Sequence, residues 1–276
     1  MRLLALDFDG VISDSAPESF AVALLTYTQM VEGSRFGDRR AALEAGSLPT
    51  PSRLTEDPLY GSFLGLMPLG NRAEDFAISL SALEAKRTLA DQADYDAFRS
   101  EIDEEWLQEF HRRFYRNRTA LSRRDSTGWR RMMGPYPPFL EILHRRAGDA
   151  MLAIATAKDA ATVDALMRDY GIEALFPPER VLDKETGVHK DAHLQQLHEA
   201  VGVAYDEMVF VDDKVNHLDR VARLGVRCAL AGWGYNGERE VELARRRGYR
   251  VCTLENAEEQ LFGWQPADPS DSLATS

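Results

Sequence analysis

Runs of apolar residues alternate with amphipathic segments along most of this chain. The first run, residues 3–6, holds four apolar residues, which suits a strand buried on both faces of a parallel sheet. It ends in Asp7 and Asp9, followed by Gly10. Alternate side chains of a strand point the same way, and parallel strands present ligand-binding groups at their carboxyl ends. We therefore expect both carboxylates to face one crevice, where a cation such as Mg²⁺ would offset their repulsion.

From residue 134 onwards, predicted strands and helices alternate. Strands are expected at 150–157, 180–182, 208–211, 227–231 and 249–254. Helices are expected at 139–146, 160–170, 192–201, 215–224 and 238–247, with Asp191 as the N-cap of the third. This alternation predicts an α/β fold, a doubly wound parallel sheet of the Rossmann-like kind with helices on both faces.

Between the first strand and residue 134 the pattern is helical. Helices are expected at 17–32, 76–86 and 94–118, whereas residues 48–60 hold three prolines and are expected to form a loop. About 120 residues far exceed the length of an ordinary connection. We therefore predict an inserted helical domain at 15–133 and a sheet domain made of 1–14 and 134–265. The polar end, 266–276, is expected to be disordered.

Composition narrows the range of partners. The net charge of −12 makes the chain a poor binder of nucleic acid or of an anionic membrane. No apolar run is long enough for a membrane span, and the first apolar run stops too early for a signal peptide. Cys228 and Cys252 both fall in predicted strands, which favours buried free thiols over a disulfide. These features predict a cytoplasmic protein.

Further polar groups fall where the predicted sheet would bring them to one edge. Thr156 ends a strand just before a helix, so its hydroxyl and the free backbone N–H groups could bind an anion, although such a threonine is often only a cap. Lys190 precedes another helix and could supply a charge to phosphate, with Lys184 as a rival. Asp212 and Asp213 close an apolar strand, where a buried acid pair would be costly without a cation.

Four ordered segments carry a resemblance to a known family. DFDGV at 7–11, Thr156 within AIATAKD, Lys190 within HKDAHL and the acid pair within VFVDDKVNHL resemble the four motifs of the haloacid dehalogenase-like superfamily. The match is to its phosphatase branch, which includes phosphoglycolate phosphatase-like proteins, because Asp9 is the acid that phosphatases and phosphomutases keep. The resemblance implies a Rossmann-like core with a helical cap inserted between the first and second motifs.

The resemblance also implies a role for each matched residue. Asp7 would be the nucleophile that forms an aspartyl-phosphate, and Asp9 the general acid and then the base. The phosphoryl oxygens would be held by Thr156, Ala157 and Lys190. Gly10 and Asn216 would support the site, and a hydrogen bond from Asn216 could orient Asp213 or Lys190. The Mg²⁺ ligands would be Asp7, Asp9 through its backbone carbonyl, Asp212 and Asp213.

The expected function is therefore a Mg²⁺-dependent phosphatase that hydrolyses a small phosphorylated metabolite. The alternatives are a phosphomutase or other phosphotransferase, and an inactive module that binds a phosphometabolite. Some relatives carry a second acid where this chain has His217, which we expect to be solvated or helix-capping rather than a metal ligand. The arginine-rich segment 112–131 is either a solvated helix end or a grip for a second anionic group. The sequence names neither the substrate nor the oligomeric state.

Overall fold

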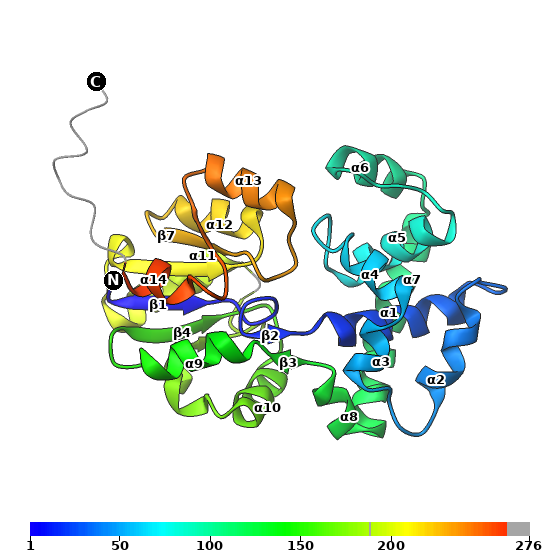
Figure 1. Cartoon of the computed structure of the whole chain (residues 1–276), viewed down its shortest axis with the longest axis horizontal. Coiled ribbons are helices and arrows are strands. Elements are labelled where there is room, and N and C mark those ends of the chain that lie inside the picture. Colours follow the sequence, from blue (N-terminus) through cyan, green and yellow to red (C-terminus); the bar gives the residue numbers. More distant parts are fainter. Residues whose placement is uncertain (188, 264–276) are drawn as a thin grey trace. The chain divides into compact units, whose positions relative to one another are not determined.

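The structure of this protein, a computed structural model, describes residues 1–187 and 189–263 (Figure 1). The segment 266–276, expected to be disordered, lies outside the described residues. The chain divides into two compact units. One consists of Met1–Ser13 together with the described residues from Pro135 onward, and the other of Asp14–Gly134.

Six parallel strands form the sheet of the first unit, in the order β5–β4–β1–β6–β7–β8. Their bounds are β1 Leu3–Leu6, β4 Met151–Ala155, β5 Val181–Leu182, β6 Met208–Asp212, β7 Arg227–Ala231 and β8 Arg250–Cys252. The first strand lies in the middle, with Leu3 opposite Met151 on one side and Met208 on the other. All four residues of β1 are buried, as expected for a central parallel strand. The predicted α/β fold with a parallel sheet is confirmed.

Helices follow the strands of this unit, and apolar side chains of the strands are buried beneath them. The helices are α9 Pro137–Arg145, α10 Ala160–Tyr170, α11 Lys190–Val201, α12 Val215–Ala222, α13 Glu238–Arg246 and α14 Ala257–Phe262. On one face, Leu3 and Ala5 pack in a core with α11, α12 and α13. On the other face, Leu4 and Leu6 have no exposed surface either, so both faces of the sheet are covered. Short 3₁₀ turns occur at Glu173–Leu175, Pro178–Arg180 and Tyr205–Glu207.

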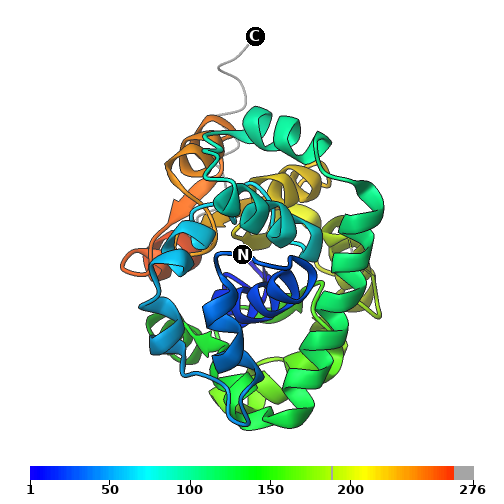
Figure 2. The same ribbon diagram turned by 90° about the vertical axis from the view of Figure 1, so that its right-hand side faces the viewer.

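The second unit is helical (Figures 1 and 2). Its helices are α1 Ala16–Met30, α2 Arg40–Glu44, α3 Pro51–Thr55, α4 Pro58–Leu64, α5 Ala73–Glu84, α6 Gln92–Ser100, α7 Glu104–Arg124 and α8 Ser126–Arg131, with a 3₁₀ turn at Gly37–Arg39. Helices α1, α5 and α7 contact one another and form the centre of the unit. Phe110 and Phe114 of α7 are buried there, and Phe114 packs against Phe76 of α5. The two ends of the unit lie in the short strands β2, Ser13–Asp14, and β3, Gly134–Pro135, which pair with each other.

Two expectations for this unit are wrong. Residues 48–60 were expected to form a loop, but α3 and α4 begin within them. Thr50 and Asp57 are their N-caps, and Pro51 and Pro58 occupy the first turns, where proline is favoured because no backbone N–H is needed. The single helix expected at 94–118 is two helices. The second, α7, begins at Glu104, and its N-cap is Asp103, whose carboxylate accepts a hydrogen bond from the Trp106 N–H.

The amino end of α11 also differs from the expectation. Asp191 was expected to be its N-cap, but the helix begins at Lys190 and the N-cap is His189. Asp191 therefore lies in the first turn, where a carboxylate still interacts favourably with the helix dipole. Among the described residues, no helix is both long and apolar enough to cross a membrane.

Candidate active site at the carboxyl edge of the sheet

The polar residues that follow the three central strands converge at one edge of the sheet. Asp7 follows β1, Thr156 follows β4, and Asp212 ends β6. The ammonium group of Lys190, the first residue of α11, lies at the same edge. Its Nζ is 2.6 Å from Asp7 Oδ1 and 3.8 Å from Asp212 Oδ2. Residues far apart in the sequence thus form one polar cluster, because the carboxyl ends of neighbouring parallel strands lie side by side.

Asp7 and Lys190 form a buried ion pair. The Asp7 N–H donates to the Val211 carbonyl, as a continuation of the sheet, and Asp7 Oδ1 accepts from the Phe8 N–H at 2.7 Å. Burial raises the pKa of Asp7, and the Lys190 charge only partly opposes this. Burial alone would lower the pKa of Lys190, but the charges of Asp7 and Asp212 outweigh it and raise that pKa. Lys190 therefore stays protonated and serves as the shared counterion of the cluster.

Lys184, the rival for this role, lies outside the cluster. Its side chain is about half exposed, and its nearest carboxylate is that of Glu185 at 3.9 Å. Ala157 is exposed directly after Thr156, and Asn216 is exposed in the first turn of α12. No hydrogen bond from Asn216 is found among the described residues, so its expected support of Asp213 or Lys190 has no counterpart in this geometry.

Asp9 has a partner that the sequence analysis missed. Lys158 Nζ lies 2.9 Å from Asp9 Oδ1 and 3.1 Å from Oδ2, so the ammonium contacts both carboxylate oxygens. The Lys158 side chain is 3% exposed, whereas that of Asp9 is 32% exposed. A lysine two residues after the strand-end threonine was a signal that could have been used, because such a loop lies at the same sheet edge as Asp9.

His217 was expected to be solvated or helix-capping rather than a metal ligand. Its side chain is 33% exposed but contacts the Asp212 carboxylate, and the N-cap of α12 is Lys214, not His217. Its Nδ1 lies 3.0 Å from Asp212 Oδ2 and 3.1 Å from Oδ1. Burial would raise the pKa of Asp212, but the His217 and Lys190 charges and the hydrogen bonds to its carboxylate lower it. The contact arises because the first turn of α12 lies over the end of β6, five residues earlier in the chain.

The side chain of Asp213 packs closely against two glycines, Gly10 and Gly234. A Cβ atom at Gly10 would lie 2.7 Å from the Asp213 carboxylate, and one at Gly234 would lie 2.4 Å from Asp213 Cβ and from the Gly10 carbonyl oxygen. The Asp213 carboxylate accepts a hydrogen bond from the Tyr235 N–H at 2.9 Å. Burial raises the pKa of Asp213 to about 7, despite the nearby Lys214 charge. A cation that binds this carboxyl group would displace its proton, so cation binding there should depend on pH.

The donor set fits a divalent cation. Asp7, Asp212 and His217 each offer one ligand atom, and these atoms lie within 4.8 Å of one another. Carboxylate oxygens suit Mg²⁺ and Mn²⁺, and an imidazole nitrogen adds a donor that transition metals accept more readily than Mg²⁺ does. Neither the Asp9 side chain nor Asp213 is part of this cluster.

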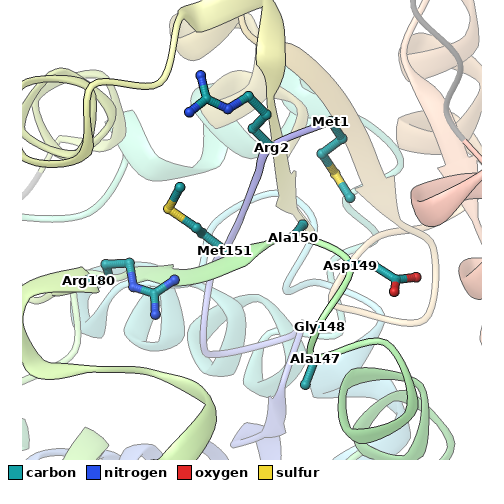
Figure 3. A pocket seen from close by; sticks show the side chains of 8 residues that line it. All are labelled: Met1, Arg2, Ala147, Gly148, Asp149, Ala150, Met151 and Arg180. Carbon is teal, nitrogen blue, oxygen red and sulfur yellow. The ribbon is translucent and has the colours of Figure 1, made fainter.

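A separate cleft lies at the opposite edge of the sheet (Figure 3). Its volume is about 440 Å³, and its lining includes Met1 and Arg2 before β1 and Ala150 and Met151 at the start of β4. Because the amino ends of these strands line it, the cleft is remote from the acids that follow their carboxyl ends.

Comparison with known proteins supports the fold but gives no close relative. No protein-family model matches the sequence, and no curated protein matches it. Among solved structures, a proposed phosphoglycolate phosphatase from Lactobacillus delbrueckii subsp. bulgaricus is 14% identical, with a TM-score of 0.66 over 95% of this chain and 98% of its own. A haloacid dehalogenase-like family hydrolase from Streptococcus pneumoniae is 15% identical, with a TM-score of 0.60 over 93% and 96%. A predicted phosphoglycolate phosphatase from Haemophilus somnus is 18% identical, with a TM-score of 0.58 over 93% and 96%. The chain therefore has the fold of the haloacid dehalogenase-like hydrolases.

Proposed function

We propose that this protein is a Mg²⁺-dependent phosphatase that hydrolyses a small phosphorylated metabolite through an aspartyl-phosphate on Asp7. The observation that carries the proposal is the buried triad in which Lys190 joins Asp7 and Asp212 at the carboxyl edge of the sheet. An aspartate there combines a fixed position, a cationic neighbour and a cation-binding donor set, which are what phosphoryl transfer to a carboxylate needs. The shared fold with proteins described as predicted or proposed phosphoglycolate phosphatases adds support.

The proposed reaction has two displacements. In the first, an Asp7 carboxylate oxygen bonds to phosphorus, the bond from phosphorus to the alcohol oxygen breaks, and Asp9 donates a proton to that oxygen. In the second, water attacks the phosphorus, gives its proton to Asp9, and the carboxylate of Asp7 leaves. Dividing one difficult step into two easier ones is the usual benefit of covalent catalysis.

The remaining residues would hold the phosphoryl group. We assign its oxygens to the Thr156 hydroxyl, the Ala157 backbone N–H and the Lys190 ammonium, since charge accumulates on these oxygens in the transition state. A divalent cation would be held by Asp7, Asp212, Asp213 and the Asp9 backbone carbonyl, and would neutralise further phosphoryl charge.

The helical unit, Asp14–Gly134, is proposed to act as a cap that selects the substrate, since the chain inserts it between the first and second motifs. Of the arginines in segment 112–131, Arg118 is already held by the buried Glu18, with Nε 2.8 Å from Oε1. Arg112 and Arg113 bind Glu109 of the same helix. These three arginines are thus used within the unit, which favours a structural role for them over a grip on substrate.

A phosphate-release screen over phosphorylated metabolites, with and without chelator, tests the proposal. Asp7→Asn should abolish turnover, whereas Asp164→Asn, which changes an exposed helix carboxylate of the same unit, should leave it unchanged. Retained turnover in Asp7→Asn refutes the nucleophile role. Adding an acceptor alcohol separates the alternatives: a phosphatase releases inorganic phosphate, whereas a phosphotransferase passes the group to the acceptor.

A further inference from the structure

Lys158 is a buried cation for which the proposed reaction as described above has no use. Its Nζ contacts both carboxylate oxygens of Asp9, at 2.9 and 3.1 Å, and its side chain is 3% exposed. A buried lysine is costly unless it is paired, so the contact with Asp9 fixes the ammonium as well as the carboxylate. Asp9 retains about a third of its surface, as a group that must meet substrate should.

Both backbone polar groups of Lys158, the N–H and the carbonyl, form hydrogen bonds. Its N–H donates to the Thr156 hydroxyl oxygen at 3.2 Å, and its carbonyl accepts from the Lys184 N–H at 3.1 Å. The loop between β4 and α10 is thus tied to the turn after β5. The position of the ammonium is therefore set by the fold, and a long flexible side chain becomes a fixed donor.

We propose that Lys158 is a positioning residue for Asp9. It grips both carboxylate oxygens and so keeps this side chain apart from the cation cluster of Asp7, Asp212 and His217, which does not include it. The inference rests on the proposed function, in which Asp9 transfers protons to and from the reacting oxygens. Without the grip, a carboxylate two residues from Asp7 could rotate to the cation and be lost for proton transfer.

The competing role for Lys158 is direct binding of the phosphoryl group. The geometry favours positioning, since a contact to two oxygens of Asp9 leaves the ammonium committed to that carboxylate. Lys190, in contrast, lies against the proposed nucleophile, 2.6 Å from Asp7. Lys190 therefore pairs with Asp7 and Lys158 with Asp9, so each acid of the first motif has its own lysine.

A double-mutant cycle on turnover distinguishes the two roles. The variants are Lys158→Met, Lys158→Arg, Asp9→Glu and the Lys158→Met/Asp9→Glu double variant, assayed on the best substrate from the phosphate-release screen. We expect Lys158→Met to lower kcat by about 10- to 100-fold, part of what general acid–base catalysis contributes. KM and the Kd for inorganic phosphate should change less than twofold, and Lys158→Arg should restore part of kcat. In the Asp9→Glu background, losing Lys158 should cost much less than in the wild type.

Lys184→Met is the matched control, because it removes an exposed lysine from the neighbouring turn and should leave kcat and KM unchanged. Crystal structures of Lys158→Met and Lys158→Arg give a readout that does not need turnover. The Asp9 carboxylate should move away from its wild-type position in Lys158→Met and keep that position in Lys158→Arg.

Three outcomes would each overturn the positioning role. They are losses of kcat that add fully in the double variant, an Asp9 side chain that does not move in Lys158→Met, and a tenfold weaker binding of inorganic phosphate by Lys158→Met. If Asp7→Asn retains turnover, the proposed function itself fails. If Asp7→Asn is inactive and the cycle is additive, only the role of Lys158 fails. Should Lys158→Met not fold, Lys158→Gln carries the same comparison with a polar side chain.

Discussion

Replacing Gly10 by alanine should strain the centre of the site. Gly10 has a φ of +80°, in the left-handed region that glycine adopts freely. An added Cβ would lie 2.7 Å from both Cγ and Oδ2 of Asp213, closer than van der Waals contact allows. Asp213 has little room to retreat, because its carboxylate is held by the Tyr235 N–H and Gly234 packs against its Cβ.

The magnitude follows from three contributions. A left-handed backbone costs a residue with a Cβ about 1–2 kcal/mol. Forcing an extra methyl group into a packed site costs about 1–3 kcal/mol. Alanine also lowers the conformational entropy of the unfolded chain, which stabilises the folded protein by about 0.4–1 kcal/mol. The free energy of unfolding of the sheet unit should therefore fall by between about 1 and 4.6 kcal/mol, with about 3 kcal/mol expected.

Hydrogen exchange measured by mass spectrometry reads this change locally, in peptides that cover β1 and β6. A loss of about 3 kcal/mol corresponds to roughly 150-fold faster exchange of the most protected amides. Urea unfolding followed by circular dichroism gives an independent estimate, although two units need not unfold in one step.

Gly148→Ala is the control, since nothing lies within 4 Å of its added Cβ and its φ is not positive. It should change the stability by less than about 1 kcal/mol. A Gly10→Ala protein that exchanges at the wild-type rate, within the spread set by Gly148→Ala, would refute the close packing of Gly10 against Asp213.

Three further outcomes are expected. Lys190→Met should lower the free energy of unfolding at pH 8 by about 3–5 kcal/mol in urea titrations, because the buried carboxylates of Asp7 and Asp212 lose their counterion; a loss no larger than in Lys184→Met would contradict this. Mg²⁺ at 100 times its Kd should stabilise the folded protein by about 2.7 kcal/mol and so raise the thermal midpoint in scanning fluorimetry. Asp213→Asn should remove most of this rise, whereas Asp164→Asn should keep it. Burial and the Lys190 charge lower the pKa of His193, so the unfolded chain takes up a proton near pH 6.5 before the folded protein does. The contribution of His193 to stability should therefore be lost as the pH falls from 7.5 to 5.5, by at most about 1.4 kcal/mol per pH unit, whereas Asp213, with its pKa raised to about 7, contributes in the opposite direction. The wild type should thus lose more stability than His193→Asn over this range, and equal pH slopes in the two proteins would exclude His193 as a source.

The sheet could be predicted because its signal is local. Four apolar residues before Asp7, and the run before Asp212, are typical of central parallel strands, and β1 and β6 are buried throughout. The same rule of sheet geometry placed Asp7, Thr156 and Asp212 at one edge, where the structure has them. The choice of Lys190 over Lys184 came from its place before a helix, and α11 does begin at Lys190.

The contacts of Lys158 and His217 could not be predicted from pattern alone. Their side-chain directions depend on how a loop folds back after β4 and on how α12 lies over the end of β6. In the helical unit, the prolines of 48–60 resembled loop residues, because a sequence alone does not show whether proline interrupts a helix or starts one. The N-caps Thr50 and Asp57 decide that they start helices.

The pairing of β2 with β3 has a consequence for the order in which the protein assembles. Asp14 and Gly134, the two ends of the helical unit, lie in these adjacent strands. While those roughly 120 residues are unfolded, closing them as a loop costs about 3 kcal/mol more than closing a four-residue turn, by the logarithmic dependence of loop entropy on length. Once the helices have formed, the connection from β1 to β4 no longer contains a long unfolded loop and runs through the β2–β3 pair and α9. Early folding of the helical unit should thus speed the pairing of β1 with β4, and a chain in which residues 14–134 are replaced by a tight turn should still build the sheet.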